Sequence, residues 1–539
     1  MKTKFILGLV AILLMNVLCN AGKPRVGNDS ILPNQQVKSK DIPIIDQAFL
    51  HGFTHNVVNA SISGEKVQTL SIQCTDDNVH KGGARTSYSV WTRDLYWGFL
   101  GWAQAGNDSV LDMMKSSLRL LIAAKNKNQA TGQNPIWPLN DKRFYIPQAY
   151  DQNLTTAKDL FPWCSESQAD FILLAYNYWK LSGDIEFIKS IWNEITYVTK
   201  TLELMDTDGN SLPDALWGSY DYMYLTLDTE EPLMCAKTSM VYSRVADLSR
   251  ILGESAYADK LETLAAKIKK VMNKNVKEGG LWKKQGNGGY YVMRKITKGE
   301  AKIPEFIRKD LPAQLAAFYS KGENTLNDFI PYENLVPMWC GMTSNDQDKA
   351  IFSKLDAGFD KYYNMNYGPM YCAPAGHNSQ SVSDGSSVTW LAFLDVFLRG
   401  KKGCLTNRSK IYDMLLQHAY DAGKIPFSEG MGVYGSLTDG AGRTWDNGNY
   451  FHMLICGIYG LEKDNNNITI SAPVLIEGTP LTELKNFYWG NAIYNFSWKG
   501  TGSKIKTITV DGEKVNHEIG EYKLFDKAGK HNVQIIMIE

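Results

Sequence analysis

Two loops that lie far apart in the sequence each carry a carboxyl group in a setting suited to acid–base chemistry. One loop contains Trp217 and Asp221, and the other places Glu429 between the small residues Ser428 and Gly430, which leave room for a ligand. A pair of carboxyl groups can hydrolyse a glycosidic bond, because one protonates the leaving oxygen while the other activates water or attacks the sugar. Each loop therefore offers a candidate, and a solvated surface glutamate is the alternative interpretation of Glu429.

A third segment combines an aromatic side chain with two opposite charges directly before an expected helix. It reads Trp91-Thr-Arg93-Asp94. The indole supplies a stacking face for a sugar ring, and the arginine and aspartate can bond neighbouring hydroxyls as donor and acceptor. Aspartate is also a favoured N-cap residue, so helix capping is the alternative for Asp94.

Two further loops end in polar and aromatic residues that suit a binding site. Ser165 with Gln168 matches a capping box, whereas Glu166 and Gln168 could instead contact a substrate. Aromatic faces come from Trp217 in the third long loop and Trp445 in the sixth. The candidate substrate-binding residues are therefore Trp91, Arg93, Asp94, Glu166, Gln168, Trp217 and Trp445.

An acidic turn between Asp206 and Asp214 raises the question of a calcium site. It lacks the glycine at the sixth position and the glutamate at the twelfth that an EF-hand requires, so an Asp/Gly turn is the favoured interpretation. The cysteines that follow Cys19 are scattered and form no C-x-x-C pair. The sequence thus predicts neither a metal site nor a cofactor.

Glycines recur at a slow interval along most of the chain, and most stand in short polar turns between helical patterns. They are Gly106, Gly183, Gly253, Gly322, Gly400 and Gly460. Glycine just past a helix end adopts the left-handed conformation that closes the last turn, so each predicts a helical hairpin. Apolar spacing places the helices at approximately 43–58, 94–105, 109–127, 165–181, 184–204, 233–252, 255–273, 311–320, 345–360, 386–399, 403–421 and 447–459.

Short links alternate with long links in this helical region. The long links, which precede the inner helix of each hairpin, are rich in aromatic residues, glycine and acids. This alternation predicts a mainly α fold, an (α/α)6 toroid in which six inner helices are surrounded by six outer helices. An irregular helical domain is the alternative. In a toroid all the long loops share one face, so the candidate residues would gather there.

The pattern changes after Gly460. Apolar and polar residues alternate in 467–471, 492–498 and 505–510, and Asp511-Gly512 signals a hairpin, so a small C-terminal β-module is expected. The expected layout is a signal peptide at 1–21, a flexible leader at 22–41, the helical catalytic domain at 42–462 and the β-module at 463–539.

Charge and the N-terminal segment restrict the partners and the location. Lys and Arg number 57 and so do Asp and Glu, which removes the electrostatic case for a nucleic-acid partner. Lys2 and Lys4 precede an apolar run at 5–18 that is short for a membrane span, so we expect a signal peptide cleaved near Ala21. A membrane anchor and a lipid on Cys19 are the alternatives. The expected location is periplasmic or secreted, and the pattern specifies no oligomeric state.

The segment Trp91-Thr-Arg93-Asp94 before a helix resembles the glucoamylase family and its six-hairpin relatives, including debranching-enzyme and rhamnosidase-like domains. In that family the equivalent residues bind the terminal sugar. Ser428-Glu429-Gly430 resembles the family's Ser-Glu-Gln segment with the general base, although Gly430 replaces the glutamine. The family's general acid is a glutamate shortly after a Leu-Trp pair, but the residues after Leu216-Trp217 contain Asp221 and no glutamate.

The resemblance implies an inverting glycosidase that removes terminal sugars from a carbohydrate substrate, with Glu429 as the base. Asp221 is the hypothesised acid, and Asp214 or Glu166 would be its substitutes. The two carboxyl groups should then lie about 6.5–9.5 Å apart, whereas about 5 Å would indicate a retaining enzyme. The alternatives are a polysaccharide lyase using His377, Tyr220 and Tyr434, and a glycan-binding protein without catalysis.

Overall fold

The computed structural model describes most of the chain beyond residue 47. The residues described are 48–49, 52–71, 90–106, 108–131, 145–150, 164–216, 227–295, 325–326, 328–365, 368, 370–371, 387–421, 427, 430–431, 437–439, 442–465, 467–474, 476, 483–489, 491–500, 502, 504–515, 522–525 and 528–539.

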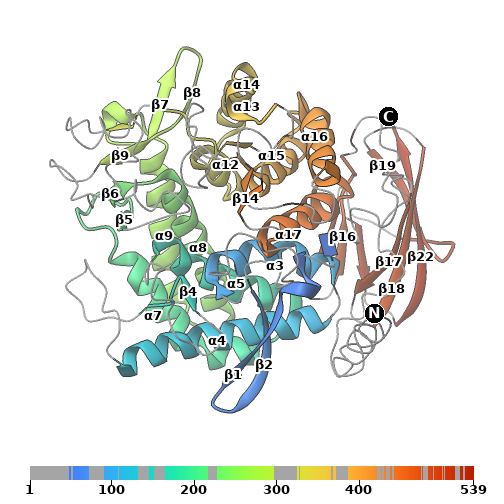
Figure 1. Cartoon of the computed structure of the whole chain (residues 1–539), viewed down its shortest axis with the longest axis horizontal. Helices are drawn as coiled ribbons and strands as arrows, with labels where there is room; N and C mark the ends of the chain where they lie inside the picture. Colours follow the sequence, from blue (N-terminus) through green and yellow to red (C-terminus); the bar gives the residue numbers. More distant parts are fainter. Residues whose placement is uncertain are drawn as a thin grey trace, which may run out of the picture.

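Six helices form a closed inner ring (Figure 1). They are α3 (Thr92–Ala105), α5 (Ser165–Ser182), α8 (Pro232–Ile251), α12 (Tyr332–Trp339), α15 (Thr389–Lys402) and α17 (Thr444–His452). Each packs against the next in this order, and α17 packs back against α3. Most of their residues are buried on every side, as expected for helices enclosed by others.

The seam between α3 and α17 depends on glycine. A Cβ at Gly101 would lie 1.7 Å from the Gly448 carbonyl oxygen, and a Cβ at Gly448 would lie 2.4 Å from the Gly98 carbonyl oxygen. No side chain fits between backbones this close. The three glycines therefore let the first and last inner helices touch and close the ring.

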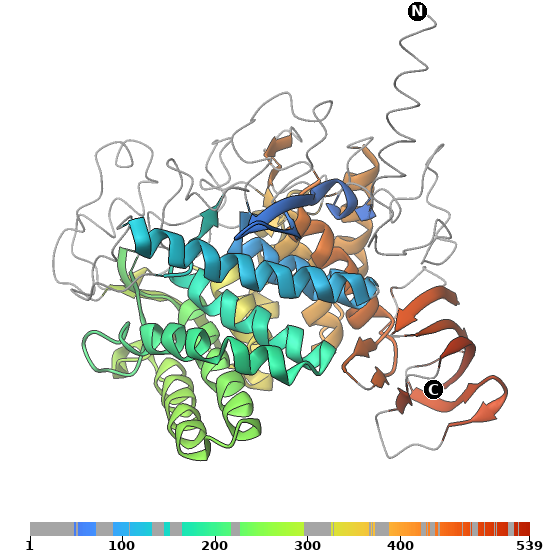
Figure 2. The same ribbon diagram turned by 90° about the horizontal axis from the view of Figure 1, so that it is seen from below.

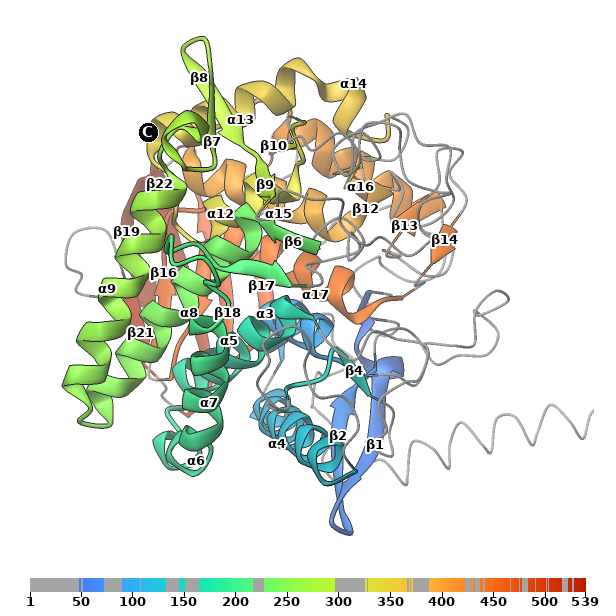
Figure 3. The ribbon, with the colours of Figure 1, turned by 90° about the vertical axis from the view of Figure 1, so that its left-hand side faces the viewer.

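A second set of helices covers the ring from outside. They are α4 (Asp108–Thr131), α6 (Ile185–Ser190), α7 (Trp192–Glu203), α9 (Ser255–Met272), α13 (Asn345–Ala357), α14 (Phe359–Tyr362) and α16 (Arg408–Asp421). On α9 the buried residues Ala258, Leu261, Ala265 and Ile268 form one stripe that faces α8, and Figure 3 shows the two helices side by side. The (α/α) toroid expected from the sequence is confirmed as the fold class.

The turns between paired helices follow the glycine pattern in part. Gly183 (φ 68°) and Gly253 (φ 84°) adopt the predicted left-handed conformation. Gly106 does not, because its φ of −87° and ψ of −179° are extended. Gly400 lies inside α15, and Gly403 (φ 69°) makes the turn instead, so the prediction for Gly400 is wrong.

The expected helices at 43–58 and 447–459 need correction, and one inner helix was missed. From Val57 the chain forms a hairpin of β1 (Val57–Ile62) and β2 (Glu65–Leu70) after the short turn η1 (Thr54–Asn56), because Val57 and Val58 favour a strand. This hairpin packs along α4 (Figure 2). The α-helix of the last segment ends at His452 and continues as a π-helix, η3 (Met453–Ile458). The missed helix is α12, and the expected helix at 311–320 lies outside the described residues.

Short strands lie beside the ring, and several lead directly into inner helices. They are β3 (Val90–Trp91), β4 (Ala149–Tyr150), β5 (Asp214–Leu216), β6 (Leu227–Glu230), β7 (Trp282–Gln285), β8 (Gly288–Tyr291), β9 (Met293–Lys295), β10 (Thr325–Leu326), β11 (Met370–Tyr371), β12 (Ser387–Val388), β13 (Gly430–Met431) and β14 (Leu437–Asp439), with the turn η2 (Val276–Glu278) before β7. One sheet has the order β10-β9-β6-β5 and another β11-β12-β13-β14. β3, β6 and β12 run into α3, α8 and α15.

Two antiparallel-rich sheets form the C-terminal part, at one side of the helices (Figure 1). The first is β15 (Leu461–Lys463), β16 (Asn467–Ile470) and β21 (Tyr522–Phe525). The second has the order β17 (Glu483–Trp489), β18 (Ala492–Lys499), β22 (Gly529–Ile538), β19 (Lys504–Val510) and β20 (Glu513–Lys514), with β18 and β22 parallel. Their alternating burial confirms the expected β character. Within the described part of the chain, no helix has the length and apolar character that crossing a membrane requires.

Candidate functional site

The starts of the inner helices meet at one end of the ring, which we call the rim. The rim comprises the first six residues of each of the six inner helices and the residue before each. It carries buried carboxyl groups from five of the six helices: Asp94, Glu166, Asp170, Glu231, Glu333 and Asp446. Helix N-termini favour negative charge, since their backbone N–H groups point outward without partners.

One side of the rim is a buried charge cluster shared by α3, α5 and α8. Lys237 Nζ donates to Glu166 Oε1 and to Asp170 Oδ1, both at 2.5 Å. Arg93 Nη1 lies 3.8 Å from the other oxygen of Glu166. All four side chains are at most 2% exposed. Two cations thus share two carboxylates from which water is excluded.

Burial and pairing act against each other in this cluster. Burial raises the pKa of Asp170 well above its ordinary value, although the Lys237 charge opposes the rise. Burial lowers the pKa of Lys237, but attraction to Asp170 and Glu166 outweighs it, and the pKa of Lys237 is raised overall. The lysine is therefore charged at neutral pH, and it holds the two acidic side chains together.

The next part of the rim joins α8 to α12. The Leu233 backbone N–H, in the first turn of α8, donates to Glu333 Oε2 at 2.8 Å. Burial raises the pKa of Glu333 to about 8, and the negative charge of Glu166 adds to the rise. Glu231, directly before α8, is fully buried as well. The Glu333 carboxyl group therefore favours its protonated form at neutral pH.

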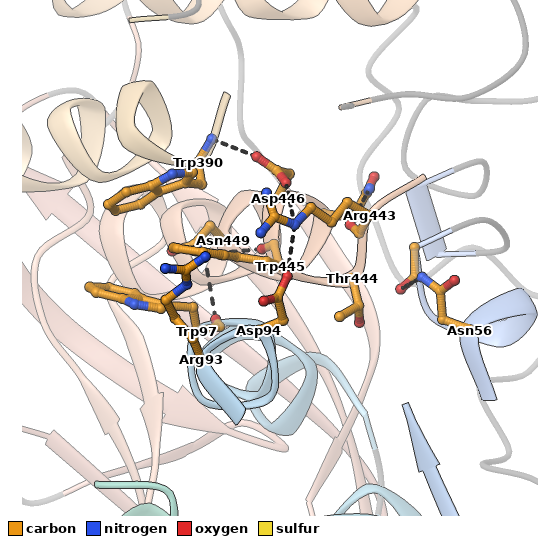
Figure 4. Close-up of polar contacts among 12 residues, drawn as sticks. Asn56, Arg93, Asp94, Trp97, Trp390, Arg443, Thr444, Trp445, Asp446 and Asn449 are labelled. Atoms are coloured by element: carbon orange, nitrogen blue, oxygen red, sulfur yellow. Dashed lines mark hydrogen bonds and ion pairs between the residues drawn. The ribbon is translucent and has the colours of Figure 1, made fainter. Parts of the chain in front are cut away.

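The opposite side of the rim joins α3, α15 and α17 (Figure 4). Arg443 Nε donates to Asp94 Oδ1 at 2.7 Å and lies 3.9 Å from Asp446 Oδ2. Asp446 Oδ1 accepts from Thr389 Oγ1 at 2.7 Å and from the Trp390 N–H at 2.9 Å. Burial raises the pKa of Asp446 to about 7, although the Arg443 charge and these hydrogen bonds oppose the rise.

Three tryptophans fill the centre of the ring beside the rim (Figure 4). Trp445 stacks on Trp97 with ring centroids 6.0 Å apart, and its centroid lies 4.7 Å from that of Trp390. The guanidinium carbons of Arg443 and Arg93 lie 4.7 and 5.3 Å from the Trp445 ring. Trp445 is fully buried in this stack, as are Arg93 and Asp94, so the role of its face in sugar binding stays a prediction.

Two further expectations about single residues also need correction. Gln168 does not form a capping box with Ser165. Its amide instead bonds the backbone of Ile146, at 3.2 Å to the N–H and 2.8 Å to the carbonyl, and also the Cys164 carbonyl, so this amide is occupied within the protein. Asp94 lies inside the first turn of α3 rather than at its N-cap, and its partner is Arg443. Trp91 is buried at the end of β3.

The proposed catalytic pair lies outside the described residues, and so do Trp217 and the alternatives His377, Tyr220 and Tyr434. Their described neighbours are placed beside the rim. The segment with Asp221 connects β5 to β6, and β6 leads to Glu231 and α8. Glu429 falls in sequence between Phe427 and Gly430, and Gly430 pairs with Val388, the residue before α15.

The sequence analysis missed several rim residues, although weak signals for them exist. Asp170 and Lys237 are charges within helical patterns that are otherwise apolar, where unpaired charges are rare. The pair Glu230-Glu231 stands directly before Pro232, and proline is favoured at the first position of a helix. Glu333 belongs to the helix that the sequence pattern did not reveal.

No protein-family model matches the sequence, and a comparison with curated proteins gives no match. Solved structures resembling the chain include a bacterial glucoamylase complexed with acarbose (14% identity, TM-score 0.46, 68% of this chain covered) and a GH78 family rhamnosidase from Bacillus sp. GL1 (13%, 0.46, 76%). An uncharacterized conserved protein from Thermus thermophilus is similar over 76% of this chain and all of its own (10%, TM-score 0.48).

The chain spans about half of the length of the glucoamylase, at 49%, and 37% of the rhamnosidase. These distant structural neighbours include a glucoamylase and a rhamnosidase, the two kinds of enzyme that the Trp-x-Arg-Asp segment resembles. A likeness at 10–14% identity describes the arrangement of the helices and not the chemistry of a site.

Proposed function

We propose that this protein is an exported glycoside hydrolase that removes terminal sugars with inversion, with Asp221 as general acid and Glu429 as general base. The observation that carries the proposal is the rim, where buried carboxylates and cations from five inner helices gather. Both proposed catalytic residues belong to segments that lead to this end of the ring. Hydrolysis of a glycosidic bond requires two carboxyl groups on opposite sides of the bond.

The placement of Asp221 is supported by the strands on either side of it. β5 and β6 are antiparallel, with Asp214 opposite Glu230, so the segment that contains Asp221 joins the far ends of this pair. β6 then leads through Glu231 into α8 at the rim. We propose that the general acid acts from the segment between these two strands.

The placement of Glu429 is supported by two anchored neighbours. Phe427 is fully buried, packs on Phe393 with ring centroids 4.8 Å apart, and accepts a hydrogen bond from Asn447 Nδ2 at 3.1 Å. Gly430 belongs to β13 beside β12. Residues 427 and 430 are thus both tied to the start of α15 or α17, on the other side of the rim from α8.

The closed centre of the ring supports action on chain ends. Trp97, Trp390 and Trp445 come from the starts of three inner helices and pack on one another, which supports a site closed at the centre of the ring. A site closed on one side accepts a terminal sugar and leaves the rest of the substrate outside. We propose that Trp91, Arg93, Asp94, Glu166, Trp217 and Trp445 contribute to the subsite for that sugar, and we no longer include Gln168, whose amide bonds the backbone.

The first experiment identifies the substrate and the stereochemistry. The secreted protein is screened against aryl glycosides and oligosaccharides of defined linkage, and the anomer first released is followed by proton NMR. The proposal expects a single terminal sugar to be released with inverted configuration. Retention would contradict the inverting mechanism, and release of an unsaturated uronide would indicate the lyase. Binding without turnover across the panel would indicate a glycan-binding protein.

The second experiment separates the acid from the base. A general acid matters most when the leaving group is poor, since a good leaving group departs without a proton. Asp221→Asn should therefore retain activity on a glycosyl fluoride while losing roughly 10²–10⁴-fold on a natural glycoside. Glu429→Gln should lose activity on both substrates. Equal losses for Asp221→Asn on both substrates would contradict the acid assignment.

Export is proposed from the leader at 1–21. Intact-mass analysis of the protein recovered from the periplasm or medium should show an N-terminus close to Gly22. Retention of the first 21 residues in a cytoplasmic product would contradict export.

A further inference from the structure

Three carboxyl groups converge beside the rim without belonging to it, where the turn after α7 meets the pair β5 and β6 (Figure 1). Asp208 comes from the turn, Asp214 from β5 and Glu230 from β6. One carboxylate oxygen of each lies within 4.8 Å of those of the other two. All three groups offer only oxygen ligands.

Two of these carboxylates are buried directly opposite each other. Asp214 pairs with Glu230 in the antiparallel register, and the two residues are 0% and 1% exposed. Like charges opposite each other in a sheet are destabilising, and burial increases the cost. A buried arrangement of this kind needs positive charge to offset it.

The protein itself supplies only part of that charge. Glu230 accepts from Arg294 Nε and from Asn210 Nδ2, while Asp214 Oδ2 accepts from the Thr207 N–H at 2.9 Å and from its hydroxyl. Among the residues that the structure describes, one arginine thus faces three carboxyl groups.

The second carboxylate oxygen of Asp214 marks the position where a positive partner is missing among the described residues. Asp214 Oδ1 is fully buried and has no hydrogen-bond partner among the residues that the structure describes. A buried carboxylate oxygen left in this way has lost its water and gained no partner in exchange. Because negative charge also exceeds positive charge among the described groups of the cluster, a divalent cation satisfies both the oxygen and the charge.

We propose that Asp208, Asp214 and Glu230 bind one Ca²⁺ ion, which fixes the β5–β6 pair at the start of α8. Ca²⁺ takes six to eight oxygen ligands in flexible geometry, and a cluster of carboxylates without His or Cys suits it better than Zn²⁺. Mg²⁺ demands a tighter octahedral shell and keeps its waters. The sequence pattern predicted a plain turn because Glu230, the third ligand, lies on a strand far along the chain.

The site has a structural consequence for the rim. Glu230 is the last residue of β6, and the next residue, Glu231, precedes α8. An ion bound between Asp214 and Glu230 replaces the repulsion between these two carboxylates with attraction of both to the ion, and so links strand β5 to strand β6. The Ca²⁺ ion therefore stabilises the pair that carries the segment with Asp221, without contacting a substrate.

The test uses the full chain, stripped with EDTA and then dialysed against Ca²⁺ or Mg²⁺. We expect about one bound calcium per chain by elemental analysis, and a Tm rise of roughly 3 °C at Ca²⁺ concentrations about 100-fold above the Kd. Mg²⁺ should give a much smaller shift. Because neither measurement involves a glycan, failure here leaves the proposed hydrolase unaffected, and absence of hydrolysis leaves the ion site unaffected.

Three variants make the assignment specific. Asp208→Asn changes an exposed ligand, so the variant should fold normally and lose the bound calcium and the Tm response. Asp214→Asn should lose both as well, and it should melt at a higher temperature than the native chain in EDTA, because one of two opposed charges is gone. Asp259→Asn, an exposed aspartate on α9 paired with Arg250, is the control and should bind calcium normally. The proposal is overturned if the native chain binds no calcium at 1 mM, roughly the weakest affinity of extracellular calcium modules, or if Asp208→Asn binds it undiminished.

Discussion

The rim and the turn between α8 and α9 carry charge in different ways. At the rim, Lys237, Glu166 and Asp170 form ion pairs that are almost fully buried. At the turn between α8 and α9, the pair of Arg250 with Glu262 is about half exposed. Buried ion pairs are a poor source of stability, because the cost of removing water can exceed the gain from attraction. A ring that needed only to fold would fill the rim with apolar residues, so the rim charges indicate a function.

Removal of the cation from the rim cluster should produce the largest loss of stability. Lys237→Ala leaves Glu166 and Asp170 buried beside each other with one fewer positive charge, and we expect about 3–5 kcal/mol of destabilisation. Chemical denaturation measures it. The control is Glu262→Ala, which removes an exposed partner of Arg250 and should cost less than about 1 kcal/mol. Similar losses for the two variants would mean that the rim and the turn between α8 and α9 do not differ.

The glycine seam and a glycine turn provide a second contrast. Gly101→Ala places a methyl group against the Gly448 carbonyl, and neither backbone can yield without separating α3 from α17. We expect a loss of about 3 kcal/mol and a lower Tm. Gly253→Ala meets nothing within 4 Å and should cost only about 1–2 kcal/mol for its left-handed backbone. A smaller loss for Gly101→Ala than for Gly253→Ala would contradict close contact in the seam.

The rim should also lose stability as the pH rises. The pKa of Glu333 is raised to about 8 in the folded protein and is near 4.5 when exposed, so the folded state holds more protons between these values. Its contribution to stability is therefore present at low pH and is lost as the pH rises toward 8. Glu333→Gln, which keeps an acceptor for the Leu233 N–H, should remove about 2 kcal/mol of this decline between about pH 5 and 8. An unchanged pH profile would contradict the buried, protonated state.

His452, at the end of α17 away from the rim, should have the opposite pH dependence. Burial lowers its pKa to about 4 from about 6.5, so the unfolded chain binds the extra proton between these values. The stability contribution falls as the pH drops through this window. His452→Phe, which preserves stacking on Phe397, should reduce the loss between pH 6.5 and about 5 by about 1 kcal/mol. Thermal unfolding at each pH measures the effect, and identical slopes would contradict it.

Much of the ring could be predicted from local signals. Apolar stripes such as that of α9 and glycine turns such as Gly183 are set by residues that lie close together in the sequence. Helix α12 was missed because it is short and contains Pro337, which a sequence pattern treats as a helix breaker. The strand β1 was missed because β-branched residues followed a helical pattern without a marked turn.

The candidate site could be predicted only where one segment carries the signal. Trp91, Arg93 and Asp94 lie close together in the sequence, so their position at the start of a helix could be predicted. The partners Lys237 and Arg443 come from helices far along the chain, and a single sequence does not specify such pairings. The packing of Trp445 on Trp97 and Trp390 could not be predicted for the same reason, because these residues also lie far apart in the sequence.

The most direct test of the proposed glycoside hydrolysis compares the kcat of two glutamine variants. Glu429→Gln alters the proposed base, and Glu278→Gln alters an exposed glutamate on the turn η2 that has no proposed role. With equal Tm values for both variants, the account predicts that Glu429→Gln loses roughly 10²–10⁴-fold in kcat on the preferred glycoside while Glu278→Gln matches the native protein. Native turnover by Glu429→Gln would contradict the assignment of glycoside hydrolysis to the rim.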